Sequence, residues 1–307
     1  MISMMTEAMT MEKLKVNINI ENDDKLLNDM KKAYLACPAA IKYCNDLKIP
    51  EEKIDENIVK IFDFVSDINY CKKCPGVKKC AKANPLLCTK IVYDHGEIDR
   101  QLVPCKELLK QITFKRQFQV MDFPEEWLDS SLRTLDRNAG RDLALDRYRS
   151  FIKDKDNSWI YLSGSKNSGR SYFAAALVVD AARKDRGPIC FLNTTSRLRE
   201  FNDLGYGKKK DEFDRKLEQY SNVPILVLDD FGNEFKSDFV RDAILFPILS
   251  ARAGKRLLTI FTSDFTIDEV ETLYSNSKAG AIRAKQISRL IKSMAREEIN
   301  LGDIAIY

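Results

Sequence analysis

Hydrophobic residues follow two different spacings along the chain, and the change between them divides it. In residues 24–48 and 51–69 apolar positions recur at helical spacing, and Pro50 followed by two glutamates is a typical helix start. From about Asp136, short apolar runs alternate with helical patterns. Strands separated by helices predict an α/β domain whose parallel sheet has right-handed crossover connections.

The alternating part predicts individual elements. The expected strands are 160–163, 189–193, 225–229 and 257–262, and the expected helices are 140–153, 171–184, one ending at Phe201, 210–220 and 238–253. Pro247 falls inside the last helix, where proline predicts a kink or an early break. After Thr262 the pattern is mainly helical.

These patterns also predict the domain organisation. We expect a disordered tail over 1–23, a helical and cysteine-rich domain over 24–108, a linker over 109–135 and the α/β domain over 136–307. Within the second segment, the residues around His95 and Gly96 predict a hairpin that turns at this pair.

The stretch from Trp159 to Tyr172 has the pattern of a buried strand, a glycine-bounded loop and a helix start. It matches the phosphate-binding motif G-x-x-x-x-G-K-[ST] except at the lysine position. Glycines permit close approach of the backbone to a polyphosphate, and the amides at a helix start bind anions. The sequence therefore predicts a nucleotide-binding loop made of Gly164, Ser165, Lys166, Asn167, Ser168, Gly169, Arg170 and Ser171, with Ser171 as a ligand of Mg²⁺.

Arg170 stands where the motif has lysine. A planar guanidinium on a different stem does not replace a compact ammonium conservatively. The sequence therefore leaves open whether a bound nucleotide is hydrolysed.

Acidic residues follow two of the expected strands. Asp229 and Asp230 end an apolar strand, so they emerge at the carboxyl edge of the sheet, where open α/β folds bind ligands. Asp229 is a candidate for the Mg²⁺ shell, and Asp230 is a candidate to orient or deprotonate water. Asp264 follows the next strand, where a polar side chain can touch the terminal phosphate or its water.

Composition limits the class of protein. The chain has 307 residues, 44% of them hydrophobic, a net charge of +4 and eight cysteines. Residues 1–16 lack the apolar segment of a secretory signal, and no apolar run approaches the roughly 18 residues of a membrane helix. We therefore expect a cytoplasmic protein in a reducing compartment with no membrane association. A basic run between Lys278 and Lys292 is either a solvated helix face or a phosphate-facing one.

Five cysteines lie within 35 residues, at positions 71, 74, 80, 88 and 105. A C-x-x-C pair presents two thiolates to one tetrahedral Zn²⁺, and a distant pair closes such a site. A redox-active C-x-x-C is the rival interpretation, although no thioredoxin-like unit surrounds it. His95 is better explained as a turn residue than as a ligand, and we expect Cys37, Cys44 and Cys190 to be ordinary buried thiols.

Several motifs occur together in an order that resembles a known family. They are Leu-Asp-Asp-Phe-Gly-Asn-Glu from 228, Val-Arg-Asp from 240, Phe-Thr-Ser-Asp-Phe from 261 and Ile-Ser-Arg-Leu from 287. With the phosphate loop, they resemble the AAA+ ATPases and, among these, the DnaC/DnaI helicase loaders. The cysteine-rich segment is similar to the DnaI branch.

The resemblance implies a fold, a function and roles for residues. The fold is a parallel-sheet P-loop AAA+ ATPase domain preceded by a small helical zinc-binding domain, and the function is primosomal delivery of the replicative DNA helicase, with ATP, Mg²⁺ and Zn²⁺ bound. Asp230, Asp264 and the arginine finger Arg289 would be catalytic, and the finger implies self-association. Asp264 stands where the resembled family usually has asparagine, and our hypothesis is that Arg170 pairs with its charge. The implied zinc ligands are Cys71, Cys74, Cys88 and Cys105, with Cys80 left over.

Single-stranded DNA is a further partner that the resemblance implies. A basic groove would follow its backbone, and the candidate residues are Lys208–Lys210, Arg252, Lys255 and Arg256. Two alternatives remain open: a nucleotide-gated adaptor that scarcely hydrolyses ATP, which Arg170 favours, and a transposition helper ATPase, which the cysteine-rich preface disfavours.

Overall fold

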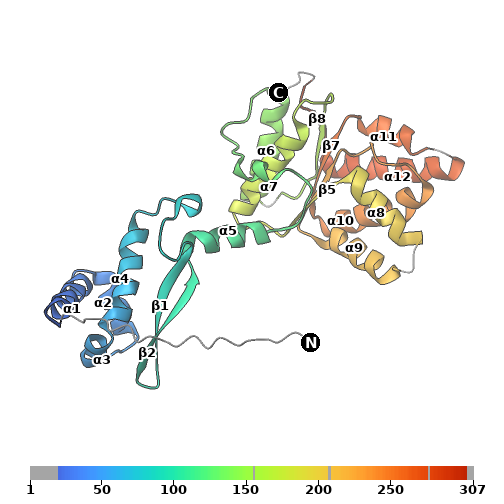
Figure 1. The fold of residues 1–307 in the computed structure, drawn as a ribbon. Coiled ribbons are helices and arrows are strands. Elements are labelled where there is room, and N and C mark those ends of the chain that lie inside the picture. The colour runs from blue at the N-terminus through green and yellow to red at the C-terminus, as the bar shows by residue number, and fades with distance from the viewer. Residues whose placement is uncertain (1–19, 155, 207–208, 276, 303–307) are drawn as a thin grey trace, which may run out of the picture. The chain divides into compact units, whose positions relative to one another are not determined.

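The chain divides into two units, residues 1–111 and 112–307 (Figure 1). The structure is a computed structural model, and it describes residues 20–154, 156–206, 209–275 and 277–302. Most of the tail expected over 1–23 lies outside these residues, and the first helix begins at Ile20. Among the described helices, none is both long and apolar enough to span a bilayer.

Four helices and a hairpin form the first unit. The helices are α1 (Ile20–Leu35), α2 (Pro38–Asp46), α3 (Glu51–Glu56) and α4 (Ile58–Lys72), followed by the 3₁₀ turn η1 (Val77–Lys79) and the strands β1 (Leu87–Asp94) and β2 (Glu97–Pro104). Pro50 immediately precedes α3, as its sequence predicts. Cys37 and Cys44 lie in the buried core of this unit, which confirms their expected packing role.

The hairpin turns at the predicted pair. β1 and β2 are antiparallel, and His95 and Gly96 join them with φ angles of +49° and +82°. A two-residue turn that matches the strand twist requires positive φ at both positions, which glycine adopts freely. His95 lies fully exposed and pairs with Asp94, so it is a turn residue, as predicted.

The second unit alternates helices and strands. Helix α5 (Lys106–Arg116) crosses the boundary between the units. The elements after it are β3 (Phe118–Met121), η2 (Glu125–Asp129), α6 (Ala139–Asp154), β4 (Ile160–Ser163), α7 (Arg170–Arg183), β5 (Ile189–Asn193), α8 (Thr194–Tyr206), α9 (Lys210–Asn222), β6 (Ile225–Asp229), η3 (Val240–Leu245), α10 (Phe246–Lys255), β7 (Leu258–Ser263), α11 (Ile267–Leu273), α12 (Lys278–Ala295) and β8 (Glu298–Asn300).

The described strands of this unit form a parallel sheet in the order β3-β5-β6-β7-β4-β8. The predicted α/β class is therefore confirmed. In the central strands successive side chains enter opposite cores: Ile225 and Val227 pack with α6 and α7, whereas Leu226 and Leu228 pack with the later helices. Figure 1 shows α6 and α7 on one side of the sheet and α8 to α12 on the other.

Two strands were not expected from the sequence. β3 lies in the stretch predicted to be a linker and pairs with β5, and the three-residue β8 pairs with β4. Both are edge strands; Gln119 interrupts the apolar residues of β3 and β8 has three residues, so neither gives a continuous apolar run.

Pro247 coincides with a change of helix type and not with a break, because residues 238–255 are helical throughout. η3 is a π-helical segment, and α10 begins directly after it with Pro247 in its first turn. Proline fits the first turn of a helix because no intrahelical bond needs its missing N–H. The helix expected over 238–253 is therefore continuous but of two helix types.

Candidate functional site

The phosphate-binding motif forms the connection between β4 and α7. Gly164 has φ +154°, and an added Cβ there would lie 3.0 Å from the Gly302 carbonyl oxygen. Gly169 caps α7 with φ +76°. These two positions therefore need glycine for backbone reasons. Between them, Lys166 and Asn167 are exposed and Ser168 is buried, and the amides at the start of the 14-residue α7 form an anion-binding end.

Asp229 ends β6 with its carboxylate buried beneath the loop. Its Oδ1 accepts a 2.6 Å hydrogen bond from the Thr262 hydroxyl, and the Ser171 side chain also hydrogen-bonds to it. Burial raises the pKa of Asp229, against the opposing effect of these hydrogen bonds. Ser171 and Asp229, the two predicted Mg²⁺ ligands, are thus in contact, and a buried carboxylate beside a hydroxyl fits a hard cation.

Asp230 sits next in the chain with an unusual backbone. Its φ is +60°, and the Thr194 hydroxyl donates to the carbonyls of both Asp229 and Asp230 at 2.9 Å. The Asp230 amide donates to the Thr262 hydroxyl. Left-handed residues other than glycine persist where surrounding contacts hold them, and they cluster at functional sites. The turn directs the Asp230 carboxylate to Asn233, whose Nδ2 lies 2.7 Å away.

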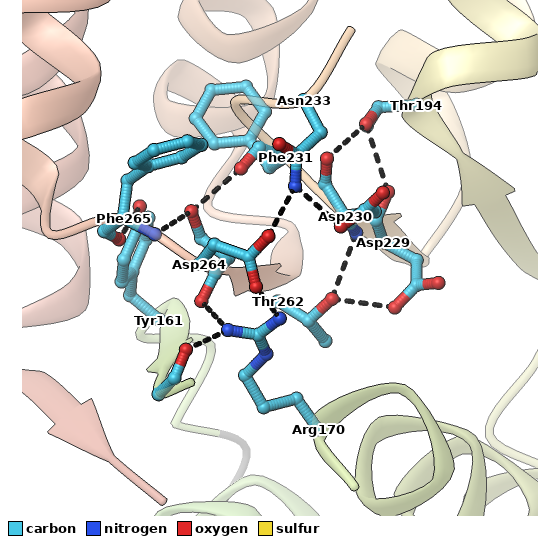
Figure 2. A network of polar contacts seen from close by, with 12 residues as sticks. Tyr161, Arg170, Thr194, Asp229, Asp230, Phe231, Asn233, Thr262, Asp264 and Phe265 are labelled. Atoms are coloured by element: carbon cyan, nitrogen blue, oxygen red, sulfur yellow. Dashed lines mark hydrogen bonds and ion pairs between the residues drawn. The ribbon is translucent and has the colours of Figure 1, made fainter. Parts of the chain in front are cut away.

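Asp264 meets Arg170 at the same edge of the sheet. The Arg170 guanidinium donates through Nη2 to Asp264 and through Nη1 to the Gly164 and Ser263 carbonyls. Figure 2 shows Asn233 bridging Asp264 and Asp230. Burial opposes ionisation of Asp264, but hydrogen bonds from Arg170 and Asn233 outweigh it and hold the pKa of this carboxyl below its ordinary value.

A cavity of about 400 Å³ adjoins the loop. Trp127, Leu135, Arg141 and Tyr172 contribute to its lining. Arg141 is buried and donates to the Ser168 carbonyl at 2.8 Å, and within the described residues its Nε and the buried Ser168 hydroxyl have no partner. A cavity lined by aromatic side chains and one arginine fits a polar planar ligand.

Sequence reasoning missed the cavity and Asn233. Trp127 and Leu135 belong to the expected linker, and Arg141 has the pattern of a surface helix residue. The Leu-Asp-Asp-Phe-Gly-Asn-Glu motif contained Asn233, so this residue was within reach of the sequence, whereas its contacts depend on the sheet order.

Arg289 does not join this group of residues. It is exposed on α12 and makes no ion pair or hydrogen bond with the described part of the chain. Lys278 and Lys285 are exposed on the same helix, as is Ile282. In the same run, Arg283 pairs with Asp242 and Lys292 pairs with Asp268.

Two of the four predicted zinc ligands come together. The Sγ atoms of Cys71 and Cys88 are 3.8 Å apart, which equals the separation of about 3.8 Å between two thiolates on one tetrahedral Zn²⁺ with Zn–S bonds of about 2.3 Å. Cys74 is exposed, and the Cys105 sulfur accepts the Leu108 amide. Among the described residues, no group of three or more histidine, cysteine or acidic side chains is arranged to hold a metal.

The prediction that Arg252 contacts DNA is wrong. Arg252 is buried, and its guanidinium donates to the Tyr220, Val223 and Leu258 carbonyls and to Thr259. It therefore stabilises the fold and is unavailable to a ligand. Lys209, Lys210, Lys255 and Arg256 are exposed, and Lys208 lies outside the described residues.

Comparison with known proteins finds relatives of two kinds. The chain is 23% identical to the replicative helicase loader DnaI of Bacillus subtilis (strain 168) over 257 residues, 81% of each chain. It is 32% identical over 143 residues to a candidate ATP-binding protein of the insertion sequence IS1162 from Pseudomonas fluorescens, which covers 45% of this chain and 58% of that protein.

Solved structures give a similar result. A crystal structure of DnaI matches with a TM-score of 0.53 and 26% identity, covering 62% of this chain and 98% of that one. A candidate primosome component from Streptococcus pyogenes serotype M3 matches with a TM-score of 0.51 and 25% identity, covering 64% of this chain and all of that one.

These relatives confirm the resemblance to the DnaC/DnaI loaders that the motif order predicts. The family model of the IstB-like ATP-binding proteins matches residues 100–291, which hold the phosphate loop, Asp229, Asp230, Asp264 and Arg289. The chain therefore belongs to the family of IstB-like ATP-binding proteins.

Proposed function

We propose that this protein is a cytoplasmic loader of the replicative DNA helicase, driven by binding of ATP and Mg²⁺ in its second unit. The observation that carries the proposal is the convergence at one sheet edge of the loop after β4, the acids after β6 and Asp264 after β7. β7 pairs with both β4 and β6, so these three groups face one site. Open α/β sheets bind nucleotides at this edge.

Residues of the second unit divide the work on the nucleotide. The loop amides and the start of α7 bind the phosphates, and the cavity beside Trp127 and Tyr172 accepts the base. Ser171 and Asp229 hold Mg²⁺, which neutralises phosphate charge when bound. A bound cation favours the charged form of Asp229, which burial alone disfavours.

Asp230 orients the attacking water. Its backbone is held by Thr194 and Thr262, and its carboxylate by Asn233, so its direction is fixed before a nucleotide arrives. Preorganised groups of this kind accelerate phosphoryl transfer because positioning is most of the catalysis.

Arg289 acts on a neighbouring copy of the chain. It is exposed and without a partner within the described residues, as an arginine that reaches another subunit's nucleotide must be. An arginine supplied in trans stabilises the charge that develops on the transferred phosphate. The active form is therefore self-associated.

The first unit binds the helicase. The alignment with DnaI covers 81% of the chain, which is more than the second unit alone can supply, whereas the insertion-sequence relative covers 45%. This difference favours a loader over a transposition helper. We also propose that Cys71, Cys74, Cys88 and Cys105 hold Zn²⁺ in this unit, supported by the approach of Cys71 to Cys88.

Single-stranded DNA binds to exposed basic residues of the second unit. With Arg252 excluded, the candidates among the described residues are Lys209, Lys210, Lys255 and Arg256. Lys209 lies 3.8 Å from Glu212 and Lys255 bonds to Asn222, so both would exchange surface partners for phosphates.

A second candidate is an adaptor that binds ATP without appreciable hydrolysis. The commitment of Arg170 to three protein acceptors favours it, because a guanidinium held by the protein is less free to follow a moving phosphate.

Helicase loading onto single-stranded DNA tests the proposal. The full chain and the cell's replicative helicase are combined with ATP, without nucleotide, or with a non-hydrolysable ATP analogue, and DNA-bound helicase is measured. We expect loading with ATP and little without it. Equal loading with the analogue selects the adaptor, and an absence of any association with the helicase rules out the loader function.

A further inference from the structure

The two departures from the loader pattern lie in direct contact. Arg170 replaces the lysine of the phosphate loop, and Asp264 stands where the resembling family usually has asparagine. The Arg170 Nη2 donates to the Asp264 Oδ1, and their side chains are 8% and 25% exposed. Residues 94 positions apart thus form one charged pair within the site (Figure 2).

Arg170 uses its planar fork in a way that lysine cannot copy. Nη1 reaches the Gly164 carbonyl at the loop entrance and the Ser263 carbonyl at the end of β7, while Nη2 holds Asp264. Lysine has three donors on one atom and no such fork. The arginine therefore fastens the phosphate loop to β7, and Asp264 provides the charged end of that attachment.

Asp264 also contacts the acid on the other side. Its Oδ2 accepts from the Asn233 Nδ2 at 2.8 Å, and the same amide donates to Asp230 at 2.7 Å. Because β7 lies between β4 and β6, the Asp264 carboxylate stands between the phosphate loop and the acid pair. The terminal phosphate of a bound nucleotide belongs in that space.

The combined charge of residues 170 and 264 affects the relative affinities for nucleoside triphosphate and diphosphate. A lysine with an asparagine gives these two positions a combined charge of +1, whereas Arg170 with Asp264 gives a combined charge of zero. The exposed Lys166 also acts on Asp264 and favours its charged form. The missing positive charge weakens the binding of a triphosphate more than that of a diphosphate, because only the triphosphate places charge beside Asp264.

We propose that Arg170 and Asp264 work as one unit in which Asp264 positions Arg170 and lowers the site's preference for nucleoside triphosphate over diphosphate. This inference rests on the nucleotide binding proposed above. Asp264 is a specificity-determining residue in this arrangement, and each member of the pair depends on the other.

Binding measurements on a double-mutant cycle test the pair. Dissociation constants for ADP and for a non-hydrolysable ATP analogue, both with Mg²⁺, are measured by calorimetry for the full chain, Arg170→Lys, Asp264→Asn and the double variant. We expect Asp264→Asn to raise the triphosphate-to-diphosphate affinity ratio at least about fivefold. Arg170→Lys alone removes the guanidinium from Asp264 and is expected to weaken the affinity for the analogue at least about tenfold. The double variant is expected to recover most of that affinity.

The exposed pair Arg149 and Asp146 on α6 is the matched control, since its atoms lie 2.6 Å apart away from the site. Arg149→Lys and Asp146→Asn are expected to leave both constants unchanged. The pair proposal is overturned if Asp264→Asn leaves the affinity ratio as it was, or if the single effects multiply to the double effect within about twofold.

The possible failures are distinguishable. If the natural protein binds neither nucleotide, both the proposed function and this inference are refuted. If the natural protein binds both nucleotides and the effects in the cycle are multiplicative, only the proposal that Arg170 and Asp264 act as a unit is refuted. Thermal unfolding verifies that each variant is folded, and the near-isosteric Asp264→Asn ratio decides the outcome even where Arg170→Lys does not fold.

Discussion

At the scale of single residues, the ionisation of Asp264 contributes to the stability of the fold. Burial opposes the charge, and hydrogen bonds from Arg170 and Asn233 more than offset it, so the pKa of Asp264 is lower in the folded chain than in the unfolded one. A carboxyl whose pKa is lowered in the folded state stabilises the fold at pH values above its unfolded-state pKa. This stabilisation is lost as the pH falls through the folded-state pKa.

We therefore predict that Asp264→Asn destabilises the chain at pH 6 and that the difference shrinks below about pH 4, the unfolded value for aspartate. Urea unfolding of both proteins at several pH values measures it. Asp146→Asn on α6 is the control, with an expected change within about 0.5 kcal/mol at each pH. A difference that stays constant down to pH 3 would contradict the assigned linkage.

At the scale of elements, Arg252 joins three segments of the second unit. From α10 it donates to carbonyls at the end of α9, just beyond it and on β7, and its exposed fraction is 0%. Its removal leaves these buried acceptors unpaired, and each unsatisfied group costs about 1–3 kcal/mol.

Arg252→Ala is accordingly predicted to lower the free energy of unfolding by about 3 kcal/mol or more. Equilibrium urea unfolding measures this. Arg199→Ala on α8 is the control, because Arg199 is exposed, and its effect is expected within about 0.5 kcal/mol. Equal effects of the two substitutions would show that the buried network contributes little.

Arg252 also marks the limit of prediction from sequence. The strands over 160–163, 189–193 and 225–229 have the predicted bounds, because parallel strands buried on both faces appear as short continuous apolar runs. Arg252 appeared as a surface charge, since nothing local indicates that the distant Tyr220 and Val223 carbonyls reach it. The Arg170–Asp264 contact was likewise only a hypothesis, because it depends on β7 lying beside β4.

At the scale of the whole molecule, the two units have separate cores. Residues from Tyr34 to Ile98 form the core of the first unit, and the cores on the two faces of the sheet begin at Phe123 and Trp159. Helicase binding and nucleotide binding are therefore properties of different parts of the chain in our proposal, and a substitution that weakens one unit need not weaken the other.

Zinc removal separates the two properties. Cys71 lies in the last turn of α4 and Cys88 is the second residue of β1, so a metal between their sulfurs, 3.8 Å apart, would join the helices to the hairpin. We predict that Cys71→Ser and Cys88→Ser each release zinc and abolish helicase pull-down without changing nucleotide affinity, whereas Cys80→Ser retains the metal. Metal analysis of the purified chains and calorimetry with ADP measure both effects. A zinc-free natural chain, or zinc retained by Cys88→Ser, would exclude the proposed ligands. A loss of nucleotide affinity on zinc release would mean instead that the two cores are energetically coupled.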